Sequence, residues 1–345
     1  MVEFYILLCY NHKVEAKRLA YYDLLKTMLI MLVVVGHIFE IFVNNELIKS
    51  IYLTIYSFHM PLFVFISGFF AKWKKIRFFA YLLMFVVFSI VPNCIYSLFT
   101  KPITLDSVVS SIVCPSWGMW FLLVMPFWNL SLLFLKRVKL YHVGISIIIA
   151  LAVGFIPFVG EILSLSRMFY FFPFFLLGKW CGQNKDKFNQ SIKKSQTLTN
   201  KLISVCLLTL TLFLFIFIFT NAPIELFYGK MPYQRLEDCF QRLLCIGVGL
   251  LNGLAFLILI PLKSDYNHFV SSFLSLGEKT LPIYVFHIYV LMAVKELCKN
   301  YLPLSLSSNL FFILTFAFCL TIIIVIVTSR KLFVKITNSF LKIFT

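Results

Sequence analysis

An apolar run near the N-terminus contains four ionisable side chains whose spacing suits group-transfer chemistry. They are Asp23, Lys26, His37 and Glu40. If the run is an α-helix with 100° between residues, Lys26 falls about 20° from His37 around the axis, Asp23 about 40° and Glu40 about 60°. All four therefore share one face, with Lys26 and His37 about 16 Å apart along the axis.

An imidazole on such a face suits general-base work or transient acyl transfer, because this side chain titrates near neutral pH. Glu40, one turn beyond His37, would orient the ring, and Lys26, held by Asp23, would meet the phosphates of an anionic donor. These four residues are the catalytic candidates. The structural alternative is that they form hydrogen bonds between packed helices.

Two further histidines lie in apolar runs. His59 comes just before Pro61 in SFHMPLFVFISGFF, and His287 shares a helix face with Thr280 and Tyr284 in TLPIYVFH. A cavity shared with His37 would make His59, Tyr284 and His287 candidates for substrate binding. His59 would otherwise satisfy backbone carbonyls that Pro61 frees, and His287 would serve packing.

Polar and aromatic residues also occur at the predicted outer ends of membrane spans. Trp120 and Arg167 are candidates for substrate binding, Trp120 by stacking on a sugar or else as an interfacial anchor. Arg235, Asp238 and Arg242 share one face if their helix begins early. They would bind an acidic glycan or pair with one another.

Composition requires that these side chains be carried by membrane helices. Of 345 residues, 61% are hydrophobic and 13% charged, whereas a soluble domain carries roughly 25% charged residues. Apolar blocks long enough to cross a bilayer predict an all-α, polytopic transmembrane helical bundle of about ten spans. The predicted spans are 24–43, 51–70, 78–99, 119–135, 141–159, 167–181, 202–219, 242–261, 280–297 and 309–328.

Basic residues collect before the first span and after the second, fourth, sixth and tenth, which places both termini in the cytoplasm. This bias explains the net charge of +17 without nucleic acid as a partner. Lys74, Lys75 and Arg77, together with Lys26, are candidates for binding a nucleotide-like donor, although the bias alone also accounts for them. The outer segment 220–241 is a candidate lid or binding loop, and the inner segment 182–201 is predicted to be a flexible loop.

The nine cysteines show no spacing typical of metal ligands. Several lie inside apolar runs, where cysteine behaves as a small hydrophobic residue. No metal site is therefore expected.

The order of several motifs resembles the acyltransferase family 3 membrane enzymes, and most closely their fucose 4-O-acetylase-like branch. YYDLLK, GHIFE and SFHMPLFVFISGFF open the pattern, with Lys26 and His37 separated by ten residues. GMWFLL with Trp120, the run from Arg167 to Gly178, and LGEKTLPIYVFH ending at His287 follow in order. Many members carry Arg where this chain has Lys26.

The resemblance implies an acyltransferase-3-like membrane domain over 18–330, with an N-terminal extension over 1–17 that is interfacial or disordered and a basic cytoplasmic tail over 331–345. It implies transfer of an acyl group, usually from acetyl-CoA, to a hydroxyl of a cell-surface glycan or lipid-linked oligosaccharide. His37 would be the catalytic residue and Lys26 its partner on the donor side. The expected location is the inner (plasma) membrane of a bacterium, with the lipid bilayer as a further partner.

Two non-enzymatic alternatives use the same polar cavity. An exporter of a glycan or lipid-linked sugar would need no CoA, and a proton-coupled transporter built on Glu40 and His37 would depend on a proton gradient.

Overall fold

A computed structural model describes residues 2–97, 104–115, 117–160, 162–262 and 268–343. Every regular element in these ranges is helical. The helices that form the bundle are α1 (Val2–Phe39), α2 (Glu46–Phe69), α3 (Lys75–Ser97), α5 (Trp120–Ser131), α6 (Leu140–Ala152), α7 (Leu165–Gln183), α9 (Leu198–Phe217), α10 (Glu237–Leu259), α12 (Thr280–Tyr301) and α14 (Leu310–Thr328).

Shorter helices cap the two ends of the bundle. They are α4 (Leu105–Val113), α8 (Lys185–Ser195), α11 (His268–Gly277), α13 (Leu304–Ser307) and α15 (Lys331–Lys342), with 3-10 turns η1 (Glu40–Phe42), η2 (Trp117–Met119), η3 (Val153–Phe155), η4 (Pro157–Val159) and η5 (Ile162–Ser164). The predicted flexible loop 182–201 is thus wrong in part, since α8 occupies its centre. Apolar side chains spaced along α8, Phe188 and Ile192, pack into the inner core and hold this helix in place.

The predicted polytopic bundle is confirmed. Within the described residues, eight helices are long and apolar enough to span a membrane, and α5 and α6 are shorter apolar helices in the two remaining predicted positions. Each of these two is lengthened at its outer end by a 3-10 turn, η2 or η3. The chain is therefore an integral membrane protein.

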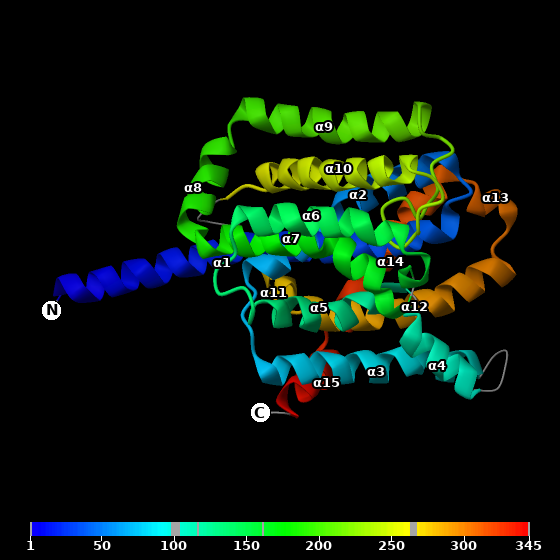
Figure 1. The fold of residues 1–345 in the computed structure, drawn as a ribbon, viewed down its shortest axis with the longest axis horizontal. Helices are drawn as coiled ribbons and strands as arrows, with labels where there is room; N and C mark the ends of the chain where they lie inside the picture. The colour runs from blue at the N-terminus through cyan, green and yellow to red at the C-terminus, as the bar shows by residue number, and fades with distance from the viewer. Residues whose placement is uncertain (1, 98–103, 116, 161, 263–267, 344–345) are drawn as a thin grey trace.

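Successive helices of the bundle run in opposite directions (Figure 1). The N-terminal end of α1, the helix α8 and the C-terminal end of α15 lie at one end of the bundle, and α4 and α13 lie at the other. The basic segments of the sequence lie at the end of the bundle that contains α8 and the N-terminal end of α1. The charge bias assigns this end to the cytoplasm. The helix α1 extends from the bundle back to Val2, while an interfacial or disordered role for residues 1–17 stays a prediction.

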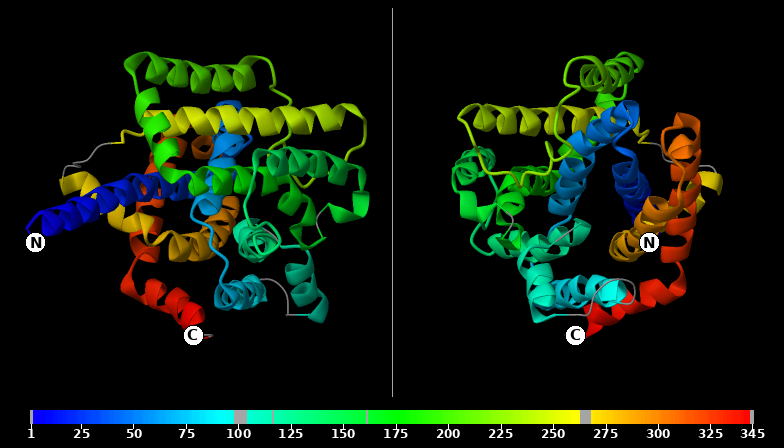
Figure 2. Two further views of the ribbon diagram at one scale, coloured as in Figure 1. Left: turned by 60° about the vertical axis from the view of Figure 1, so that its left-hand side comes forward. Right: turned by 90° about the vertical axis from the view of Figure 1, so that its right-hand side faces the viewer.

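Helix α1 has a central position, against α2, α11, α12 and α14. Helix α9 lies at one edge of the bundle beyond α10, and α3 and α15 lie at the opposite edge (Figure 2). The polar face of α1 is therefore turned toward protein, as the cost of exposing ionisable groups to lipid requires.

The contact between α2 and α7 depends on glycine. A Cβ at Gly68 would lie 2.0 Å from the carbonyl oxygen of Phe175, and one at Gly178 would lie 1.9 Å from that of Phe65. Only glycine allows the two backbones to approach so closely, as is common where membrane helices cross. This crossing fixes α7, and with it Arg167, relative to α2.

Candidate active site

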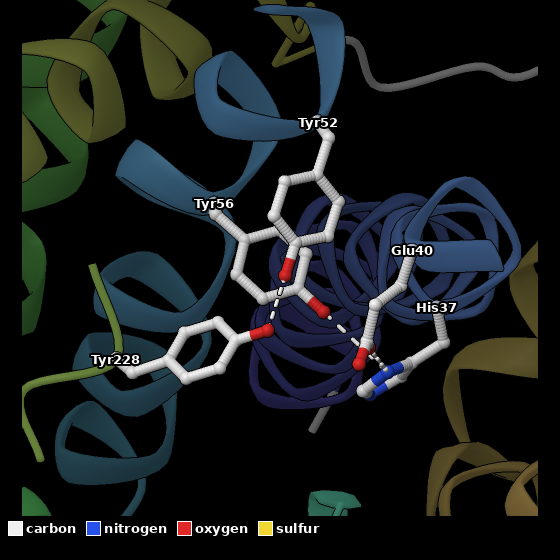
Figure 3. Close-up of polar contacts among 5 residues, drawn as sticks. All are labelled: His37, Glu40, Tyr52, Tyr56 and Tyr228. Atoms are coloured by element: carbon white, nitrogen blue, oxygen red, sulfur yellow. Dashed lines mark hydrogen bonds and ion pairs between the residues drawn. The ribbon is translucent and has the colours of Figure 1, made fainter. Parts of the chain in front are cut away.

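His37 and Glu40 form a pair at the outer end of α1. His37 lies in the last turn of the helix and Glu40 opens η1, with His37 Nδ1 3.1 Å from Glu40 Oε2 (Figure 3). Because a carboxylate can only accept, Nδ1 donates its proton, and in the neutral ring the lone pair is on Nε2. This is the tautomer that a general base acting through Nε2 requires.

The part of α1 and η1 that is long and apolar enough to span a membrane is Ala20–Phe42. His37 lies nearer the outer end of this segment than its inner end.

Three tyrosines lie beside the His37–Glu40 pair, on the side that faces α2. Tyr56 places its hydroxyl oxygen 3.4 Å from His37 Nδ1 and stacks on Tyr52, with ring centroids 4.0 Å apart. The Tyr52 hydroxyl is hydrogen-bonded to that of Tyr228, which comes from the segment between α9 and α10 (Figure 3). Burial raises the pKa of Tyr228, so its phenol stays protonated and neutral beside Glu40.

A cavity of about 360 Å³ opens beside this pair. His37 and Glu40 line it, as do four of the predicted substrate-binding residues: His59, Trp120, Arg167 and Tyr284. Helices α1, α2, α5, α7 and α12 each contribute one or more of these side chains. Distant parts of the sequence therefore converge on one site at the outer end of the bundle.

Arg167 is held between aromatic rings in this cavity. Its guanidinium carbon lies 5.6 Å from the ring centroid of Trp120 and 5.6 Å from that of Tyr228. Phe171 stacks on Trp120 at 5.0 Å, and Trp120 is only 6% exposed. Little of that ring is left for stacking on a sugar, so its clearest contact in the cavity is with Arg167.

The turn before α7 directs Arg167 into the cavity. Leu163 and Ser164 have φ values of 48° and 53°, a left-handed conformation that non-glycine residues rarely adopt. Such backbone costs about 1–3 kcal/mol per residue and persists only where surrounding packing imposes it. Ser164 is buried and lines the cavity three residues before Arg167.

His59 and His287 use the same hydrogen-bonding scheme. Nδ1 of His59 donates to the Ile55 carbonyl (2.9 Å), and Nδ1 of His287 donates to the Ile283 carbonyl (3.0 Å). His59 therefore bonds a carbonyl other than that of Ser57, which Pro61 leaves without its helical donor. His287 is fully buried behind the cavity wall, with its ring centroid 5.5 Å from that of His37.

A second cavity of about 260 Å³ lies toward the cytoplasmic end. Of the predicted donor-binding residues, Lys26, Lys74 and Arg77 line it, joined by Lys72, whereas Lys75 is exposed and does not. Lys26 Nζ lies 2.6 Å from Asp23 Oδ1. The four-residue stripe thus separates into two pairs: His37 and Glu40 line the outer cavity, whereas of Asp23 and Lys26 only Lys26 lines the inner one. Tyr284 lines both.

The proposed glycan-binding cluster Arg235, Asp238 and Arg242 does not form. Arg242 is buried and donates to the carbonyls of Ala150 (3.0 Å) and Met231 (2.9 Å). Asp238 accepts from the backbone amides of Gln234 and Arg235. The physical reason is that Arg242 satisfies backbone carbonyls at the outer end of the bundle, which makes it a structural link.

Several cavity residues were missed by the sequence reasoning. They are Tyr56, Glu225, Tyr228, Lys230 and Lys295. Tyr52 and Tyr56 are four residues apart and precede His59, so a shared helix face could have identified them. Glu225, Tyr228 and Lys230 lie in the segment 220–241, which was predicted to be a lid or binding loop, but no sequence signal selects these individual residues. In the part of the chain that the structure describes, no cluster of three or more metal-ligating side chains occurs.

Comparison with known proteins gives one family match. No curated protein and no solved structure matches the chain. The model of the acyltransferase family 3, described as an acyltransferase domain, matches residues 19–330. This range includes both cavities and every candidate residue named above, and it covers most of the chain. The protein therefore belongs to the acyltransferase family 3 and is a membrane acyltransferase.

Proposed function

We propose that the protein transfers an acetyl group from cytoplasmic acetyl-CoA to a hydroxyl of a cell-surface or lipid-linked glycan. The observation that carries this proposal is the pair of cavities at opposite ends of the bundle. The inner one is basic, the outer one holds the His37–Glu40 pair, and Tyr284 lines both.

The inner cavity is suited to the donor. Lys26, Lys72, Lys74 and Arg77 offer positive charge to the phosphates of CoA at the cytoplasmic end. The pantetheine arm would then extend between the helices toward His37. Lys26 supplies a point charge rather than the bidentate fork of an arginine, so the grip on phosphate falls mainly to Arg77.

The outer cavity is suited to the acceptor. A hydroxyl that approaches His37 Nε2 gives up its proton as its oxygen attacks the thioester carbonyl carbon. The C–S bond then breaks, and the CoA thiolate leaves and takes up the proton from the imidazolium. Glu40 stabilises the imidazolium, and Arg167, which the neighbouring aromatic rings position, binds the acceptor. Alternatively, the acyl group passes briefly through His37 itself.

Membership of an acyltransferase family favours this reaction over export or proton-coupled transport. The glycan acceptor, the preference for acetyl and the placement in a bacterial inner membrane follow from the resemblance to the fucose 4-O-acetylase-like branch, and they belong to the proposal.

The test is transfer of label from labelled acetyl-CoA to the glycan fraction of membranes that contain the protein. His37→Ala should lower the rate by about 10²–10⁴, the usual contribution of a general base. His142→Ala is the matched control, because His142 lies at the inner start of α6 outside both cavities. Transfer at the wild-type rate by His37→Ala would refute the proposal.

A further inference from the structure

Tyr284 stands in the wall that the two cavities share. It lies on α12, one turn before His287, and its side chain is only 4% exposed. Its ring is 6.0 Å from the ring of His287, which is itself 5.5 Å from the ring of His37. Tyr284 and His37 therefore lie on either side of His287, both line the outer cavity, and Tyr284 also lines the inner one.

The hydroxyl of Tyr284 lacks a hydrogen-bond partner among the described residues. The backbone of Phe121, at the start of α5, lies beside it without meeting hydrogen-bond geometry. Gly118 borders the same space, since a Cβ there would lie 3.5 Å from the Tyr284 oxygen. Buried polar groups are almost always paired, and leaving one unpaired is unfavourable.

Two other tyrosines of the bundle, the half-buried Tyr289 and the buried Tyr21, do have partners within the protein. On the same helix, the Tyr289 hydroxyl donates to the Phe88 carbonyl at 2.7 Å, and that of Tyr21 donates to the Leu257 carbonyl at 2.9 Å. Tyr284 differs from both because its side chain lines the two cavities. A group bound in a cavity is then the available partner for this hydroxyl.

We propose that the Tyr284 hydroxyl is a catalytic hydrogen-bond donor to the thioester carbonyl oxygen. This inference rests on the proposed function. A thioester that comes from the inner cavity and a hydroxyl activated by His37 in the outer cavity must meet at the wall between them. When the acceptor oxygen attacks, the carbonyl π electrons move onto oxygen, and the Tyr284 O–H stabilises the resulting oxyanion. Collapse of the intermediate restores the C=O bond and expels the CoA thiolate.

Such donors act on the transition state more than on the bound substrate. Loss of one oxyanion donor typically lowers kcat by about 10²–10³. Tyr284→Phe removes only the hydroxyl and keeps the ring that separates the cavities. We expect kcat to fall by about 10²–10³ with acetyl-CoA as the donor and native membranes as the source of acceptor, while KM for acetyl-CoA changes less than about threefold.

Thermal stability distinguishes a catalytic from a structural role of the Tyr284 hydroxyl, because the loss of a structural hydrogen bond would lower the Tm. Because the Tyr284 hydroxyl bonds to no described residue, Tyr284→Phe should leave the Tm in detergent unchanged or raise it. Tyr289→Phe is the matched control, with the same chemical change on the same helix. It should lower the Tm, because the bond to Phe88 is lost, and leave kcat near the wild-type value.

The outcomes separate this inference from the proposed function. A wild-type kcat in Tyr284→Phe would overturn it, as would a rise in KM alone or a joint fall in kcat and Tm. If wild-type protein transfers label and His37→Ala does not, the proposed function stands whatever Tyr284→Phe does. If wild-type protein transfers no label from acetyl-CoA, both fail.

Discussion

Glu40→Gln is the sharpest test of how the His37 pair works. Glu40 Oε2 lies 3.1 Å from His37 Nδ1, and its side chain is 24% exposed. When His37 takes a proton, a full charge pair forms, worth ~5 kcal/mol at this distance for an effective dielectric constant of about 20. Gln keeps the size and an acceptor oxygen but loses the charge.

The expected loss is smaller than the full Coulomb value. Partial exposure screens the pair, and the amide oxygen of Gln can still accept the Nδ1 proton. We expect about 3 kcal/mol of transition-state stabilisation to disappear, which corresponds to a fall in kcat of about 10²-fold. If the amide instead turns its NH₂ group toward the ring, the imidazole adopts the wrong tautomer and the fall reaches about 10⁴.

The assay compares initial rates of label transfer from acetyl-CoA for the wild type, Glu40→Gln and Glu46→Gln. Glu46 is an exposed acid at the outer start of α2 and does not line the cavity, so its substitution should leave kcat unchanged. A kcat within threefold of the wild type in Glu40→Gln would refute the charge-stabilised imidazolium and leave Glu40 with a structural role.

Two further predictions concern donor binding and packing. Replacing Lys74 and Arg77 together by Ala should raise KM for acetyl-CoA by about tenfold, because two cations are lost from the inner cavity. The KM of this variant should also depend less on salt concentration than that of the wild type. Lys187→Ala removes an exposed charge on the cytoplasmic side outside that cavity and should leave KM unchanged. Gly178→Ala would place a Cβ 1.9 Å from a carbonyl oxygen of α2 and should sharply reduce the yield of folded protein in detergent, whereas Gly247→Ala, with no atom within 4 Å, should be tolerated. Normal yield of Gly178→Ala on size-exclusion chromatography would contradict the α2–α7 contact.

The sequence was sufficient for the helices, and it predicts their orientation in the membrane. Lipid cannot satisfy backbone hydrogen bonds, so long apolar blocks must be helical, and basic residues mark the cytoplasmic side. The family could also be predicted from the order of motifs between Lys26 and His287, and the match over 19–330 confirms it. The fucose 4-O-acetylase-like branch stays a prediction.

Part of the site was likewise predictable. Ionisable residues within a membrane helix must face protein or a cavity, which is why His37, Glu40, Lys26 and Asp23 could be selected from one helix. Their pairing also follows from helical spacing, since His37 with Glu40 and Asp23 with Lys26 are each three residues apart.

Only the tertiary structure decided which distant residues join them. Nearly every side chain of a spanning helix is apolar, so the sequence carries little information about which faces touch. Close backbone contacts such as that at Gly178 set those faces and bring Arg167 to His37. The same packing turned Arg242 inward as a structural link and placed Tyr284 between the two cavities. Hydropathy determines that a helix crosses the membrane, whereas the partner of each polar group depends on how the helices are rotated against one another.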